Sequence, residues 1–288
     1  MATSTSSFGA GKRESHDASE FYGRKIAGDG EAKALSPLVD PPPSVVDVLF
    51  NQSSESMPQL PDNCVALMVT SPPYNVGKDY DADLNLGEYL GLLKRVLAET
   101  YRVLEPGGRV AVNVANLGRK PYLPLNHHVA DLLTDVGFLL RGEIIWQKAK
   151  AAGGSTAWGS WQSAKNPTLR DIHEYIVVAS KESFRRIRKG ADSVSKEDFI
   201  SSTLSVWDIR PESAKRVGHP APFPVELPRR LIELYSFEGD LVLDPFMGAG
   251  ATALAAVETG RHFVGYDTDN SYLDLVRARL ADAELSDG

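Results

Sequence analysis

The sequence predicts an α/β fold with a mostly parallel sheet. Short apolar runs of strand length alternate with longer segments whose apolar residues recur at helical spacing. The chain has 288 residues, of which 42% are hydrophobic, and this suffices for one large core or two small ones. No run approaches the ~20 apolar residues that a membrane span needs. The elements follow in chain order.

Residues 1–43 are rich in Ser, Gly, Ala and charged side chains, and they end in Pro41-Pro42-Pro43. Such a composition buries little apolar surface, so it predicts a flexible tail or an extended arm. The ordered domain is expected from residue 44 to residue 288, beginning with the apolar stretch 44–50.

Residues 64–69 form a continuous apolar run, which is typical of a strand buried on both faces of a parallel sheet. The run ends in Thr70-Ser71-Pro72-Pro73-Tyr74. Two prolines stiffen this loop and prevent ladder pairing. The loop should therefore leave the carboxyl end of its strand, where open α/β sheets bind ligands.

The middle of the chain alternates between helical and strand patterns, with Pro106-Gly107-Gly108 and Gly137 as stop signals. We expect helices at 86–104, 126–136 and 225–235, and strands at 109–114, 138–146 and 172–179.

A nucleotide-binding pattern lies near the C-terminus. The strand 241–243 is followed by Asp244, a glycine-rich turn, a helix at 251–258 and a strand at 262–266 that ends in Asp267. Gly248, Gly250 and Ala253 fit the G-x-G-x-x-G/A spacing. Asp267 lies 23 residues past Asp244, near the ~20-residue spacing at which an acid accepts ribose hydroxyls.

Asp244, which precedes the glycines, restricts the class of ligand that this turn can bind. Asp244 would repel a pyrophosphate at the helix N-terminus, whereas it suits an ammonium group. S-adenosylmethionine carries both an ammonium and a ribose. Two alternatives remain for this unit: a turn and helix cap without a ligand, and a nicotinamide-dependent oxidoreductase based on the glycine spacing alone. The second leaves Asp244 and the Ser-Pro-Pro-Tyr loop unexplained.

Composition excludes some classes of function. Cys64 is the single cysteine, so the chain has no internal disulfide and no cysteine metal cluster, and we predict no metal site. A cytoplasmic protein is the default expectation. The net charge of −7 argues against a nucleic-acid binder that is basic all over. Residues 181–219, however, hold nine Lys/Arg against six Asp/Glu, while the remainder holds 22 against 32.

An acidic body with one basic segment is compatible with a local DNA contact. The irregular stretches 148–170 and 181–219 hold aromatic and basic residues that suit base stacking and phosphate contact. The alternative is that these are ordinary core tryptophans and a solvated basic face. The candidate DNA contacts are Lys148, Trp158, Trp161, Arg185, Arg186, Arg188, Lys189, Lys215 and Arg216.

The loop after the first buried strand offers a hydroxyl, two proline carbonyls and an aromatic ring, but no obvious base or nucleophile. This suits methyl transfer to an amino group, because a sulfonium donor is already a strong electrophile and alignment is the main requirement. Ser71 Oγ and the Pro72 carbonyl could accept the two N–H bonds of an exocyclic amino group. Tyr74 could stack on a base flipped out of the duplex.

These residues resemble known motifs. Thr70-Ser71-Pro72-Pro73-Tyr74 resembles catalytic motif IV of the amino-directed DNA methyltransferases, and Asp244–Gly250 resembles their cofactor motif I. The segment beginning at His219 resembles motif X, and Asp267 matches the acid of motif II. The order of the motifs, with the catalytic one first, resembles the beta group of that family.

The resemblance implies a Rossmann-like methyltransferase fold: a mostly parallel twisted sheet with helices on both faces, a circularly permuted motif order and a small target-recognition insertion. It implies that the insertion is 181–219 together with the loop 148–170, and it places Trp146 at motif VIII. By the same resemblance, the catalytic residues are Ser71, Pro72, Pro73 and Tyr74, and the residues that bind S-adenosylmethionine are Asp244, Pro245, Phe246, Gly248, Gly250, Thr252, Asp267, His219 and Pro220.

Serine at the first position of motif IV is commoner in the N4-cytosine enzymes of the family, so the resemblance favours cytosine N4 in double-stranded DNA. Adenine N6, an RNA or protein acceptor, and a DNA-binding module without activity are the alternatives. The usual Gly-Asp before the catalytic strand is replaced by Asn51-Gln52, so Asn51, Gln52 or Ser53 is expected to take over the adenine contact. A homodimer and a cognate restriction endonuclease stay open as partners, and no membrane contact is expected.

Overall fold

The structure is a computed structural model, and the residues it describes are 34–73, 84–118, 121–148, 159–212 and 223–286. From Leu35 onward they belong to one compact unit. A short 3-10 helix, Pro43–Val45, precedes the first strand.

Eight strands form one sheet in the order β1-β8-β7-β2-β3-β5-β4-β6. Seven of these strands run parallel, and β5 is antiparallel to both of its neighbours. The bounds are β1 Val48–Asn51, β2 Val65–Thr70, β3 Leu104–Val114, β4 Leu139–Gln147, β5 His173–Ser180, β6 Val206–Asp208, β7 Leu241–Asp244 and β8 His262–Asp267.

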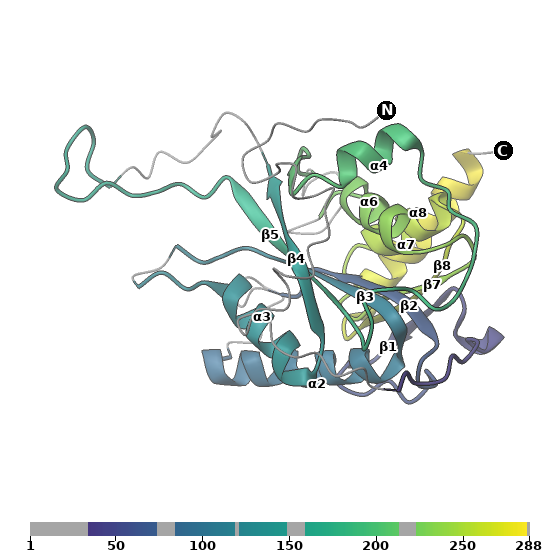
Figure 1. The fold of residues 1–288 in the computed structure, drawn as a ribbon. Coiled ribbons are helices and arrows are strands. Elements are labelled where there is room, and N and C mark those ends of the chain that lie inside the picture. The colour runs from purple at the N-terminus through teal and green to yellow at the C-terminus, as the bar shows by residue number, and fades with distance from the viewer. Residues whose placement is uncertain (1–33, 74–83, 119–120, 149–158, 213–222, 287–288) are drawn as a thin grey trace, which may run out of the picture. The chain divides into compact units, whose positions relative to one another are not determined.

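Helices cover both faces of the sheet, as Figure 1 shows. One face carries α2 and α3, which pack against each other, and the opposite face carries α6, α7 and α8 with α4 beside them. The bounds are α2 Leu86–Val103, α3 Leu125–Val136, α4 Lys196–Ser202, α6 Glu226–Tyr235, α7 Ala251–Glu258 and α8 Asn270–Ser286.

The strands divide the core into two layers because side chains alternate across a sheet. In β7, Leu243 packs into the layer under α2 and α3, while Val242 packs into the layer under α6 and α7. Met68 and Leu67 of β2 divide in the same way. Every residue of β2 is buried, which explains why its sequence is a continuous apolar run.

Local residues determine where α2 begins and where α3 ends. Asn85 and Glu88 form a reciprocal capping box at the start of α2, which satisfies two backbone donors. Gly137 ends α3 with a φ of 110°, a value in the left-handed region that favours glycine.

The predicted α/β class, the mostly parallel sheet and each predicted helix and strand are confirmed to within a few residues, except that β3 begins five residues before the predicted 109. Besides the short 3-10 helix, four elements are additional to the prediction: β1, α4, β6 and α8. The permuted order of motifs stays a prediction.

The last residues of the predicted tail or extended arm contact the domain. Ser36 donates two hydrogen bonds to the carboxylate of Glu182, and the Val39 amide donates to the Asn63 carbonyl at 3.1 Å. Residues 36–43 therefore dock on the domain, because their polar groups find partners there; residues 1–33 lie outside the described residues.

Candidate active site at the carboxyl edge of the sheet

The structure brings the two predicted loops together. β2 and β7 are neighbours in the sheet, with Leu67 opposite Val242, and both strands end at the same edge. Thr70, the last residue of β2, donates a hydrogen bond from Oγ1 to Asp244 Oδ1 over 2.6 Å. Loops that lie 174 residues apart in the sequence therefore share one edge, as their positions after parallel strands predicted.

Asp244 is fully buried, and its carboxylate is satisfied from within the protein. Oδ1 accepts from Thr70 and from the Phe246 amide, and Oδ2 accepts from Thr252 Oγ1 at 2.7 Å. Burial raises the pKa of Asp244 to about 6, and these hydrogen bonds oppose the rise. The carboxylate thus joins the ends of β2 and β7 to the first turn of α7. The residue is 2% exposed, and its contact with a ligand ammonium stays a prediction.

The glycine-rich turn has the backbone that its sequence predicts. Gly248 and Gly250 have φ values of 47° and 77°, which side-chain-bearing residues rarely adopt. A Cβ atom at Gly250 would lie 2.7 Å from the Val276 methyl groups of α8. The second glycine therefore permits both the turn and the close packing of α8 beneath it.

Asp267 ends β8 next to Asn51, the last residue of β1. Its Oδ2 accepts from the Gly248 amide at 2.8 Å, and its Oδ1 accepts from the Asp269 amide at 2.9 Å. Burial raises the pKa of this carboxyl group. An ionised carboxylate has about four acceptor positions, so Asp267 can still accept from a ribose hydroxyl. The residues present therefore fit an adenosine-type cofactor at this edge.

Side chains in the region proposed for the adenine contact form hydrogen bonds within the protein. Asn51 donates from Nδ2 to the Asp267 carbonyl over 3.1 Å, and Gln52 forms a reciprocal amide pair with Gln59. Which of Asn51, Gln52 and Ser53 would contact an adenine stays a prediction.

Sequence reasoning missed two polar residues beside Ser71. Asn113 of β3 is 1% exposed, and its Nδ2 lies 3.3 Å from Ser71 Oγ and 2.5 Å from Glu174 Oε2. Glu174, at the start of β5, is 5% exposed and forms an ion pair with Lys148. A polar residue inside an apolar run could have pointed to Asn113 and Glu174. Both lie in segments that were identified as strands from their hydrophobicity alone.

Lys148 was predicted to contact DNA, but its ammonium pairs with Glu174 and lies 5.2 Å from the Trp146 ring centre. Trp146 is buried, and its Nε1 donates to the Ile209 carbonyl at 2.8 Å. Trp161 differs from both, since 65% of its surface is exposed. It belongs to the segment 159–170, which extends beyond the sheet (Figure 1).

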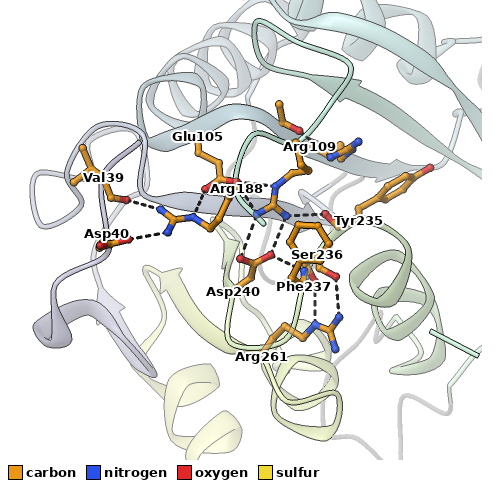
Figure 2. A network of polar contacts seen from close by, with 12 residues as sticks. Val39, Asp40, Glu105, Arg109, Arg188, Tyr235, Ser236, Phe237, Asp240 and Arg261 are labelled. Carbon is orange, nitrogen blue, oxygen red and sulfur yellow. Dashed lines mark hydrogen bonds and ion pairs between the residues drawn. The ribbon is translucent and has the colours of Figure 1, made fainter. Parts of the chain in front are cut away.

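The basic segment that was predicted to contact DNA forms ion pairs within the domain. Residues 181–191, here called the strap, cross the amino edge of the sheet, opposite the edge that holds Ser71 and Asp244. Arg186 forms ion pairs with Glu105 and Asp240, and all three side chains are at most 6% exposed. Arg188 binds Glu105 and Asp40, as Figure 2 shows.

Carboxylates of the domain already neutralise these arginines, and their contact with DNA stays a prediction. Arg185 and Lys189 are exposed, but they belong to the same strap at the amino edge. The remaining predicted residues, Tyr74, Trp158, Lys215, Arg216, His219 and Pro220, lie outside the described residues.

The described part of the chain lacks two further features. It contains no cluster of three or more His, Cys, Asp or Glu side chains that could hold a metal ion. None of the described helices is long and apolar enough to span a membrane.

Comparison with known proteins identifies the class. The N6/N4 methyltransferase family model, described as DNA methylase, matches residues 65–278. The type II methyltransferase M.MthZI of Methanothermobacter thermautotrophicus is 31% identical over 269 residues, covering 81% of this chain and 76% of its own. The type II methyltransferase M.HpaI of Haemophilus parainfluenzae is 29% identical, covering 83% and 75% of the two chains.

Solved structures agree in fold. TTHA0409 of Thermus thermophilus, assigned to the DNA modification methylases, superposes with a TM-score of 0.65 and 31% identity, covering 81% of this chain and 94% of its own. The same protein has been solved in complex with S-adenosyl-L-methionine. The cytosine-N4-specific PvuII DNA methyltransferase superposes with a TM-score of 0.64 at 20% identity, covering 80% and 84% of the two chains, which bears on the fold alone.

The fold is that of an S-adenosylmethionine-dependent methyltransferase. The chain belongs to the N6/N4 DNA methylase family, and its substrate class is DNA.

Proposed function

We propose that this DNA methyltransferase transfers the methyl group to the N4 amino group of a cytosine that has been flipped out of the duplex. The observation that carries the proposal is Ser71 directly after β2, beside the loop that Asp244 fixes. The first position of the catalytic loop is thus a hydroxyl and not a carboxylate, which favours cytosine N4 over adenine N6 by the resemblance given above.

The chemistry needs alignment and hydrogen-bond acceptors. The cofactor supplies a methyl group on a sulfonium, which is a strong electrophile. An exocyclic amino nitrogen is a poor nucleophile because its lone pair delocalises into the ring. Ser71 Oγ and the Pro72 carbonyl accept its two N–H bonds, which favours a pyramidal nitrogen and exposes the lone pair. Pro73 stiffens the loop, and Tyr74 stacks on the base.

The transfer is balanced without an added base. Bound S-adenosylmethionine would supply the methyl group: the nitrogen–carbon bond would form as the carbon–sulfur bond breaks, with a neutral thioether as the leaving group. The nitrogen then loses one of its two protons to solvent through the acceptors that hold it. Burial of the strand ends at Thr70 and Asp244 supports this role, because a dry site strengthens each hydrogen bond.

Cofactor contacts follow from the neighbouring strand ends. The backbone of Gly248 and Gly250 with Pro245 and Phe246 forms the wall of the cofactor site, and Asp267 accepts the ribose hydroxyls. Asp244 and Thr252 act through the shape of the loop, because they bond each other. Motif X, at His219 and Pro220, is a further proposed cofactor contact from the resemblance, and it lies outside the described residues.

The segment 159–170 is the proposed DNA contact among the described residues. It carries Trp161 at 65% and Leu169 at 93% exposure, together with Lys165 and Arg170. Within it there is no acidic residue. Aromatic and basic side chains at an exposed tip suit base stacking and phosphate contact.

The test is transfer of a labelled methyl group from S-adenosylmethionine to duplex DNA, followed by digestion to nucleosides. Wild type should yield labelled N4-methylcytosine, and Ser71→Ala should lose about 100-fold or more in rate, the scale of a lost charge-stabilising contact. Ser201→Ala on exposed α4 is the matched control and should keep full activity. Labelled N6-methyladenine would refute the assignment to cytosine, and an active Ser71→Ala protein would refute the role of the hydroxyl.

A further inference from the structure

The strongest unassigned feature is a line of four polar groups that ends at Ser71. Lys148 follows β4, Glu174 is the second residue of β5, Asn113 lies near the end of β3, and Ser71 follows β2. The contacts run from the Lys148 ammonium to Glu174, from Glu174 to Asn113 Nδ2, and from Asn113 Nδ2 to Ser71 Oγ. Four separate elements therefore hold one chain of contacts at the catalytic edge.

The chemistry of Glu174 fixes how Asn113 is oriented. A carboxylate that is paired with an ammonium accepts hydrogen bonds and donates none. The side-chain amide of Asn113 must therefore turn its NH2 group, and not its oxygen, toward Glu174 Oε2, which lies 2.5 Å away. Because both are almost fully buried, water cannot compete for this bond.

The second hydrogen of the same NH2 group faces Ser71. Asn113 Nδ2 lies 3.3 Å from Ser71 Oγ, so the amide donates and the hydroxyl oxygen accepts. A hydroxyl oxygen has two acceptor lone pairs and one hydrogen to donate. Because Asn113 engages one lone pair, it also sets the direction of the other, to which an amino N–H of the substrate would donate.

We propose that Asn113 is a positioning residue for the reaction, that it sets the direction from which Ser71 Oγ accepts the target amino group, and that Glu174 locks Asn113 in this orientation. This inference rests on the proposed role of Ser71. Neither Asn113 nor Glu174 contacts the substrate in this account. They act through the hydroxyl, and Lys148 compensates the buried carboxylate.

The test is a double-mutant cycle in single-turnover methyl transfer at saturating cofactor and DNA. Asn113→Ala should slow the methyl-transfer step by about 10- to 100-fold, the range expected when a reacting group is slightly misplaced. In the Ser71→Ala background the same substitution should change the rate by less than about twofold, because the group that it positions is gone. The dissociation constant for S-adenosylmethionine should stay within about twofold throughout.

Glu174→Gln tests whether Glu174 fixes the orientation of Asn113, because the substitution keeps the shape of the side chain. A glutamine amide can donate, so Asn113 can turn its oxygen toward it and lose the hydrogen bond to Ser71. The rate should fall several-fold in the wild-type background and should not fall further when Asn113 is already alanine. If Asn113→Ala fails to fold, Glu174→Gln in the Ser71→Ala background supplies the same comparison.

Asn63→Ala is the matched control for losing a buried asparagine. Asn63 accepts from Lys181 at the opposite edge of the sheet, so its loss should lower the unfolding temperature and leave the turnover unchanged. An Asn113→Ala effect of equal size with and without Ser71 would overturn the inference, as would full activity of Asn113→Ala. If Ser71→Ala itself is fully active, the proposed function fails. The cycle distinguishes this outcome from failure of the inference about Asn113, because it includes Ser71→Ala as a single variant.

Discussion

The two edges of the sheet carry polar networks of opposite kinds. At the amino edge, buried carboxylates face guanidinium groups: Glu105 binds Arg186 and Arg188, and Asp240 binds Arg186. This network fastens the strap and the N-terminal residues to the domain (Figure 2).

At the carboxyl edge, Asp244 faces the hydroxyls of Thr70 and Thr252 and the Phe246 amide. These donors are neutral, and they hold two loops in place without a cation bonded to the carboxylate within the described part of the chain.

This difference shows that local charge density is a poor guide to function in this chain. The most basic segment, from Lys181 onward, supplies structural ion pairs. The loops that carry the proposed chemistry have few charges. Ion pairing between carboxylates and guanidinium groups stabilises the amino edge. At the carboxyl edge, Asp244 is bonded to neutral donors, so its protonation is sensitive to its surroundings.

The largest expected effect is at the amino edge. Arg186→Met leaves Glu105 and Asp240 buried with one cation fewer, so the free energy of unfolding should fall by about 3–5 kcal/mol in a urea titration. Arg185→Met, on the exposed neighbour, should change it by less than about 0.5 kcal/mol. If Arg186→Met instead weakens DNA binding with unchanged stability, the arginine is a DNA contact and the comparison of edges fails.

The next effect concerns Asp244 and pH. Its folded-state pKa is raised from 3.8 to about 6, so its contribution to stability is full below the unfolded value and is lost as the pH rises through 6. Asp244→Asn cannot titrate. Its free energy of unfolding relative to wild type should therefore rise by about 3 kcal/mol between about pH 4 and pH 7.

Urea unfolding of both proteins at several pH values measures this difference. A flat difference for Asp244→Asn would mean that the buried carboxylate titrates normally.

A smaller effect separates two glycines with the same backbone. Gly250 and Gly239 have φ values of 77° and 75°, but a Cβ atom meets Val276 only at Gly250, and nothing within 4 Å at Gly239. Gly239→Ala should cost about 1 kcal/mol of backbone strain. Gly250→Ala should cost about 2 kcal/mol through overpacking and should also weaken cofactor binding. Thermal unfolding with and without S-adenosylmethionine measures both; equal losses would show that the turn is not packed as described.

The smallest expected effect tests the exposed segment. Trp161→Ala should weaken DNA binding by about tenfold, the scale of one lost stacking contact, without changing the unfolding temperature. Phe199→Ala removes an aromatic side chain of comparable exposure from α4 and should not affect DNA binding. Equal DNA affinities of the two variants would remove the segment 159–170 from the proposed DNA surface.

The fold was largely predictable because the strands are short apolar runs and the helices have clear stop signals. Gly137 ends α3 in the structure as its sequence position indicates. The element β6 was missed because an edge strand of three residues carries no detectable period.

The candidate site was predicted in part for a similar reason. Ser71, Asp244 and Asp267 lie at or just after strand ends, so topology alone places them at one edge. Asn113 and Glu174 lie inside strands: the register of β3 against β2 brings Asn113 to Ser71, and the register of β3 against β5 brings Glu174 to Asn113.

The role of Arg186 could not be predicted from the sequence. Its partners Glu105 and Asp240 are 81 and 54 residues away in the chain, so no local pattern links them.

Mass spectrometry of nucleosides from the DNA of cells that express the protein, with Ser71→Ala as the control, tests the proposed reaction and its target base together. We expect N4-methylcytosine in cells with the intact protein and none with the variant. N4-methylcytosine at equal levels in both, or N6-methyladenine in its place, would contradict this expectation.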